Sequence, residues 1–154
     1  MVSTSGGVLA QKSDFCPHIW GVSRQLPMTQ NTQSVYNLRM SIHVLTSKAT
    51  SAQMQDMLKA FLEIRMIKVV VDIDREILAG GSGMHYECEQ LLLSDGSQQE
   101  NIWGANWFPD EQSIEFESLI NIRPLQNKSI IIQDKNICNQ VERITRKYFA
   151  GGTP

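Results

Sequence analysis

Three side chains capable of metal binding or acid–base chemistry recur at helical spacing in the segment Met84–Leu93. His85, Cys88 and Glu89 are three and four residues apart, so on a helix they share one face. A catalytic zinc site uses three protein ligands of these kinds and a water. Glu87 adds a second carboxylate, and an enzyme that processes nucleotides through this region is therefore one alternative. The simpler interpretation, a hydrogen-bonded polar patch, predicts neither a metal nor another cofactor, and we adopt it.

Two basic residues, Arg143 and Lys147, lie four positions apart near the end of the chain. On a helix one turn separates them, so both cations can meet one anion such as a phosphate. The same spacing also fits a solvated basic helix end that complements the helix dipole. A loop of three glycines, Gly80-Gly-Ser-Gly83, could hold a phosphate through backbone amides. It lacks the lysine of a P-loop, and a plain turn is the preferred interpretation.

The stretch Asn101–Pro124 predicts two β-strands joined by a turn at Pro109–Gln112. Because strand side chains alternate, the first arm places Trp103 and Trp107 on one face. The second arm is expected to place five side chains on one face: Ile114, Phe116, Ser118, Ile120 and Ile122. This concentration of aromatic residues predicts either the core or a stacking platform.

Hydrophobic periodicity and capping residues predict the other elements. Helices are expected at Ser51–Glu63 after a capping box of Thr50 and Gln53, at Met84–Leu93, and from the N-cap Asp134 to about Ala150. Strands are expected at 41–46, 67–73 and 77–79, with a short strand or strap at 130–133. These elements predict an α+β fold, an antiparallel sheet with two or three helices packed on one face.

The composition changes along the chain. Residues 1–39 are polar and aperiodic, and we expect a disordered or loosely ordered extension there, followed by a single α+β domain at 40–150 and a short tail at 151–154. The alternative for residues 1–39 is an arm that binds a partner through Phe15, Ile19 and Trp20.

Charge and cysteine usage limit the possible partners and compartments. The formal net charge of −2 argues against binding a nucleic-acid polymer through a basic surface. Cys16, Cys88 and Cys138 are widely spaced, which favours a reducing compartment. No apolar run approaches the ~20 residues of a membrane helix, and the first residues lack the pattern of a secretory signal. A cytoplasmic protein without membrane contact is expected.

Two longer motifs carry a resemblance to a known family. They are Trp103-Gly-Ala-Asn106 and the run Glu115-Phe-Glu-Ser118 with Asn121-Ile-Arg-Pro124. With these, the stretch Met40–Phe149 resembles a family of small prokaryotic and phage proteins and is similar to the Thoeris anti-defence protein 1 family. The resemblance implies a phage protein that acts in the host cytoplasm. It would sequester a cyclic ADP-ribose immune signal without degrading it, as a homodimer or higher homo-oligomer.

The resemblance also implies the residues that bind the ligand. Phe116 is the expected platform for adenine, either Gln126 or Asn127 the amide that reads the base, and Arg143 the first phosphate ligand. Lys147 is the second phosphate ligand and departs from the family's arginine, which removes a planar bidentate fork. Arg123 completes the candidate set. The remaining alternatives are the enzyme that uses His85, Glu87 and Glu89, and a cellular protein of the same fold with another ligand.

Overall fold

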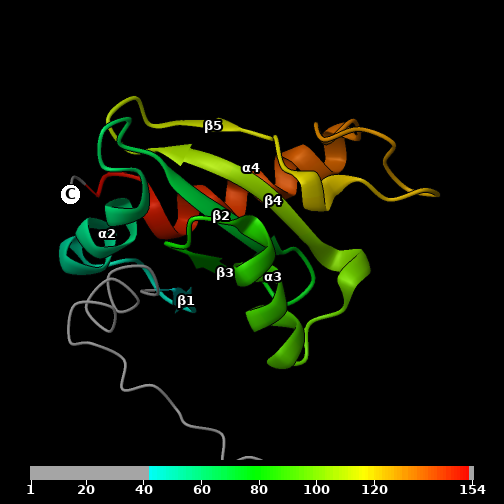
Figure 1. The fold of residues 1–154 in the computed structure, drawn as a ribbon, viewed down its shortest axis with the longest axis horizontal. Helices are drawn as coiled ribbons and strands as arrows, with labels where there is room; N and C mark the ends of the chain where they lie inside the picture. The colour runs from blue at the N-terminus through cyan, green and yellow to red at the C-terminus, as the bar shows by residue number, and fades with distance from the viewer. Residues whose placement is uncertain (1–41, 153–154) are drawn as a thin grey trace, which may run out of the picture.

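The computed structural model describes residues 42–152, and its centre is a five-stranded antiparallel sheet (Figure 1). The strands are β1 (His43–Leu45), β2 (Ile67–Asp72), β3 (Ile77–Gly80), β4 (Ile102–Phe108) and β5 (Ser113–Glu115). Their order is β1-β3-β2-β4-β5, and every neighbouring pair is antiparallel. The β-branched strand β2 occupies the middle of the sheet, where its valines are buried toward both faces.

Three α-helices and three short 3-10 helices complete the described chain. The α-helices are α2 (Ser51–Leu58), α3 (His85–Ser94) and α4 (Lys135–Phe149), and the 3-10 helices are η1 (Lys59–Phe61), η2 (Gln99–Asn101) and η3 (Leu119–Asn121). The capping box of Thr50 and Gln53 starts α2, and Asp134 caps α4, as predicted. The helix expected to reach Glu63 ends earlier, at Leu58, and continues as η1.

The helices lie on both faces of the sheet. Val69 and Val71 of β2 pack in one cluster with buried residues of α2 and α4. Val70, between them, points to the other face and packs with Cys88 and Leu92 of α3. The predicted α+β class with an antiparallel sheet is confirmed, with α2 and α4 sharing one face. The third helix, α3, covers the opposite face (Figure 1).

The paired tryptophans of β4 belong to the core beneath α4. Trp103 and Trp107 share one face, as the alternation predicted, and both are fully buried. The Trp107 ring stacks on Phe149 of α4 with centroids 6.0 Å apart. Their indole N–H groups have no hydrogen-bond partner among the described residues. The aromatic hairpin therefore serves mainly as core.

The second arm of that hairpin is shorter than predicted, and its side chains do not share one face. β5 ends at Glu115, and the Ser118 hydroxyl accepts the backbone N–H of Ile120 at the start of η3. Phe116 packs against the cluster beneath α4, whereas Ile120 packs against the cluster beneath α3. The 3-10 turn breaks the strand alternation, because its side chains repeat every three residues, whereas those of a strand repeat every two.

An asparagine side chain replaces the missing strand partner of β4. The Asn121 amide accepts the N–H of Gly104 at 2.8 Å and donates to the Gly104 carbonyl at 3.0 Å. A Cβ on Gly104 would lie 2.5 Å from Cβ of Ser118, so only glycine permits this close approach. The segment 116–133, which we call the strap, is thereby held along the edge of β4.

Two expectations fall partly or wholly outside the described residues. The extension proposed for residues 1–39 lies outside them, as do Met40 and the last two residues of the expected tail. Within residues 42–152, none of the helices combines the length and the apolar character that crossing a bilayer requires.

Candidate functional site

The predicted phosphate ligands on α4 converge on one anion. Arg143 donates from Nη2 to one carboxylate oxygen of Glu76 at 2.7 Å, and Lys147 donates from Nζ to the other at 3.0 Å. Glu76 belongs to the turn between β2 and β3, and Tyr148 donates to its backbone carbonyl. The spacing of four residues on α4 thus places two cations around one carboxylate.

The charges of this cluster stabilise one another although all three side chains remain open to water. Hydrogen bonds from Arg143 and then Lys147 lower the pKa of Glu76 to about 2. The same contact with Glu76 raises the pKa of Lys147. The carboxylate of Glu76 therefore lies between the two cations, and any other anion would have to compete with it.

Two other predicted site residues, Arg123 and Gln126, lie together on the strap. Arg123 lies over the Trp103 ring at 4.3 Å, donates to the carbonyl of Ile102, and donates to Oε1 of Gln126 at 3.3 Å. Burial lowers the pKa of Arg123, with nearby Glu89 and Glu100 acting in the opposite direction. This arginine fastens the strap to β4, so its guanidinium is committed to the fold.

The two remaining candidates, Phe116 and Asn127, differ in how much of each side chain is available to a ligand. Phe116 is half-buried against the cluster beneath α4. Asn127 is 4% exposed, donates to the carbonyls of Asn121, Ser129 and Ile131, and accepts the N–H of Gln133. Its amide is fully used within the strap. Of the two amides predicted to read a base, only the exposed Gln126 has capacity for a ligand.

The described residues thus bring Arg143 together with Lys147 and Arg123 together with Gln126. No hydrogen bond, ion pair or ring contact within residues 42–152 links these two pairs or joins either to the ring of Phe116. Of the two, the pair of Arg143 and Lys147 is the one whose cations converge on a single anion.

The cluster on α3 does not converge. His85 Nε2 donates to the Ala105 carbonyl at 2.9 Å, Glu87 accepts from Ser82, and Glu89 accepts from Gln99 at 3.3 Å. Burial raises the pKa of the Cys88 thiol to about 12 and also raises the pKa of Glu89. Across residues 42–152, no three side chains of His, Cys, Asp or Glu are grouped so that they could hold a metal ion.

The buried imidazole of His85 makes stability depend on pH. Burial, assisted by the charge of Lys68, lowers the pKa of His85 to about 4. Hydrogen bonds with the Ala105 backbone and the Asn106 side chain act in the opposite direction and raise this pKa. In the unfolded chain a histidine binds its proton near pH 6.5, so between about pH 6.5 and 4 the unfolded state binds more protons. We expect this group to reduce the free energy of unfolding as the pH falls through that window, by at most about 1.4 kcal/mol per pH unit.

Urea unfolding at several pH values tests this expectation, with His85→Gln as the comparison. The variant should lack this component of the slope, and the contribution should level off below about pH 4, where the folded ring also binds a proton. An imidazole NMR signal of His85 that titrates near pH 6.5 in the folded protein would contradict the expectation.

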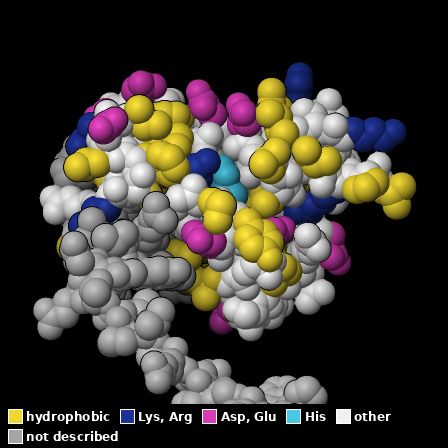
Figure 2. All heavy atoms as spheres, viewed as in Figure 1, with side chains coloured by type: hydrophobic (Ala, Val, Ile, Leu, Met, Phe, Trp, Pro, Cys, Tyr) yellow, Lys and Arg dark blue, Asp and Glu magenta, His cyan; other side chains and the backbone are white. Residues whose placement is uncertain are grey.

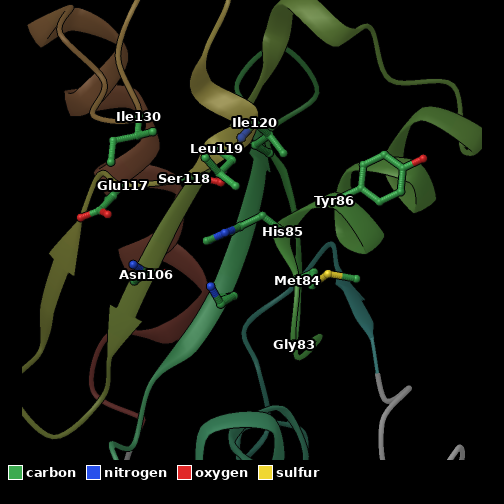
Figure 3. A pocket seen from close by; sticks show the side chains of 11 residues that line it. Gly83, Met84, His85, Tyr86, Asn106, Glu117, Ser118, Leu119, Ile120 and Ile130 are labelled. Carbon is green, nitrogen blue, oxygen red and sulfur yellow. Dashed lines mark hydrogen bonds between the residues drawn. The ribbon is translucent and has the colours of Figure 1, made fainter.

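A cleft of about 280 Å³ opens on the α3 face, beside His85. Its floor includes Lys68 of β2, which lies directly opposite Asn106 of β4. The His85 side chain points from the start of α3 toward Asn106, and Glu117 lies beyond Asn106 on the strap (Figure 3). On this face, hydrophobic side chains gather on both sides of a histidine and a neighbouring basic side chain (Figure 2).

The sequence interpretation did not find this cleft. A signal was present: Lys68 interrupts the apolar run of β2, and Asn106 alternates with the tryptophans of β4. Each residue alone is consistent with a solvent-facing strand position. Only the register that places them opposite each other, with α3 stopping short of them, defines a site.

Comparison with known proteins identifies a family. The model of a family described as a protein of unknown function (DUF5674) matches residues 43–148. None of the curated proteins and none of the solved structures matches the chain.

Proposed function

The chain belongs to the DUF5674 family, and we propose that it binds a small anionic nucleotide on its α4 surface and holds it without chemical change. The observation that carries the proposal is the convergence of Arg143 and Lys147 on the two carboxylate oxygens of Glu76. Two cations one helical turn apart can bind two oxygens of a phosphate in the same way.

The resemblance to the Thoeris anti-defence protein 1 family supplies the ligand class. It favours a cyclic ADP-ribose, whose two phosphates suit the cation pair and whose adenine suits the partly accessible Phe116 and the exposed Gln126. The proposal therefore describes a phage protein that captures this immune signal in the host cytoplasm, as a homo-oligomer. Tight capture is useful to such a protein because it releases no product.

Binding without turnover is supported by the arrangement on α3. His85, Glu87 and Glu89 each bind a different partner within the protein, so they do not face one reacting atom. The alternative, a nucleotide-processing enzyme built on these residues, needs a shared point of attack that this arrangement does not provide.

Titration calorimetry with cyclic ADP-ribose isomers tests the proposal, followed by heat denaturation and chromatography of the released ligand. We expect saturable binding of at least one isomer and recovery of that isomer intact. Absence of binding to every isomer would refute the proposed function, and recovery of a cleaved ligand would favour the enzyme.

Removing the competing carboxylate should strengthen anion binding. In Glu76→Gln the side chain keeps its size but loses the charge that an incoming phosphate has to displace. We expect the affinity for the nucleotide to rise by up to about fivefold, the scale of an exposed ion pair. Glu142→Gln on α4 removes a charge that pairs with Arg146 instead and serves as the matched control. An unchanged or lower affinity in Glu76→Gln would mean that the nucleotide does not meet this pair.

A further inference from the structure

The cleft on the α3 face exists because α3 covers only part of the sheet. The covered part is apolar and includes Val70 and Ala79, which pack against α3. The uncovered part is a polar row across three strands, in which Lys68 lies opposite Asn106 and Asn106 lies opposite Glu115. Residues opposite each other on neighbouring strands point to the same face, about 5 Å apart.

Two charged groups in this cleft lack an ion-pair partner within the described chain. The Oδ1 atom of Asn106 is closed to solvent, and the Asn106 side chain lies beside the imidazole of His85. The ammonium group of Lys68 contacts only the ring of Phe61, at 5.2 Å from its centroid, and the carboxylate of Glu117 forms neither a hydrogen bond nor an ion pair with any of residues 42–152. A ligand that carries one negative and one positive group could bind both of these charges, because charge-assisted hydrogen bonds are stronger than neutral ones.

The rest of the cleft is apolar. Its walls include Met84 at the start of α3 and Leu119, Ile120 and Ile130 on the strap. Leu119 and Met84 are largely exposed, at 78% and 55%. Such a wall favours the apolar part of a small molecule.

From these groups we propose a second binding site, for a free apolar α-amino acid. Its carboxylate would pair with Lys68, its ammonium group would donate to Glu117, and its side chain would lie against Leu119 and Ile130. Each unpaired group of the cleft thereby receives the partner that its chemistry requires.

Two further features support a zwitterion over a plain anion. The low pKa of His85 leaves that imidazole neutral at pH 7, so Lys68 is the one charged basic group that lines the cleft among the described residues. Glu117 at the rim would repel a ligand with only negative charge, whereas an ammonium group beside the carboxylate removes that repulsion. The volume of about 280 Å³ suits a molecule of this size.

Calorimetry on the full chain with L-leucine, L-methionine and L-phenylalanine tests the site. We expect at least one to bind saturably with a Kd below about 1 mM. Two chemical changes to that amino acid then probe its ends: amidation removes the carboxylate, and N-acetylation removes the ammonium charge. Each should weaken binding by about tenfold or more. No saturable binding by any of the three, or equal binding of the blocked forms, would overturn the proposal.

Variants assign the binding to this cleft. Lys68→Met keeps an unbranched side chain but removes the charge, and should weaken binding by about tenfold or more. Lys135→Met makes the same change at an exposed position of α4 and should have no effect. Arg143→Ala should also leave amino-acid binding unchanged, which separates this site from the nucleotide site. Equal binding in Lys68→Met and Lys135→Met would contradict the assignment, and the blocked ligands decide the question if Lys68→Met fails to fold.

Discussion

Arg143→Ala is expected to weaken the binding of a cyclic ADP-ribose by roughly 10- to 100-fold, the loss that follows from removing a charge-assisted phosphate contact. Arg143 donates to Glu76 from an exposed position on α4, so its guanidinium is available to a phosphate once that carboxylate is displaced. The variant should fold normally, because its side chain is not part of the core. Calorimetry at several salt concentrations measures the effect, and the remaining binding should depend less on salt.

Two comparisons make this result specific. Lys135→Ala removes the same charge from the first turn of α4, far along the helix from Glu76, and should retain full affinity. Arg143→Lys retains the charge but not the fork of two N–H groups, and should lie between wild type and Arg143→Ala. If Lys135→Ala and Arg143→Ala lose affinity equally, the helix attracts the nucleotide only through its overall charge, and the α4 pair is not the site.

Local patterns predicted most of the elements because their causes are local. The alternation of Trp103 and Trp107 predicted that both indoles share one face, which the fold makes core, and Asp134 marked the start of α4. The i and i+4 positions of Arg143 and Lys147 likewise showed that the two could meet one anion, with a solvated basic helix end as the alternative. The sequence could not predict that Glu76 would be this anion, since Glu76 lies in a turn 67 residues before Arg143 in the chain.

The prediction of the second hairpin arm was wrong for a related reason. Alternating apolar residues after Glu115 suggested a continuous strand along β4. The backbone there pairs instead with residues 130–132, and the Asn121 amide makes the hydrogen bonds to Gly104 of β4. Asn121 uses its amide to hold the backbone of Gly104, 17 residues away in the chain, and Asn127 uses its amide to hold backbone groups within the strap, which composition cannot reveal. For Asn127, this use within the fold competes with the predicted role in reading a base.

Asn121→Ala should be strongly destabilising. Asn121 is fully buried, accepts from Gly104, and donates to the carbonyls of Gly104 and Ile130 at 3.0 Å each. Alanine leaves the buried N–H and carbonyl of Gly104 without these partners, whereas the Ile130 carbonyl keeps the N–H of Ser118 at 2.9 Å. An orphaned buried group costs about 1–3 kcal/mol. Because several groups lose one donor or acceptor together, we expect a loss of about 3 kcal/mol, or roughly 6–12 °C in Tm for a chain of this size.

Asn139→Ala provides the matched control, since Asn139 is exposed on α4 and alanine favours a helix. Its Tm should stay close to that of wild type. Hydrogen exchange adds a local measurement: in Asn121→Ala the Gly104 amide should exchange much faster, because its acceptor is gone. If Asn121→Ala has the same Tm as Asn139→Ala and the Gly104 amide stays protected from exchange, another contact holds the strap against β4. The close approach of Ser118 to Gly104 would then be the next contact to alter, by Gly104→Ala.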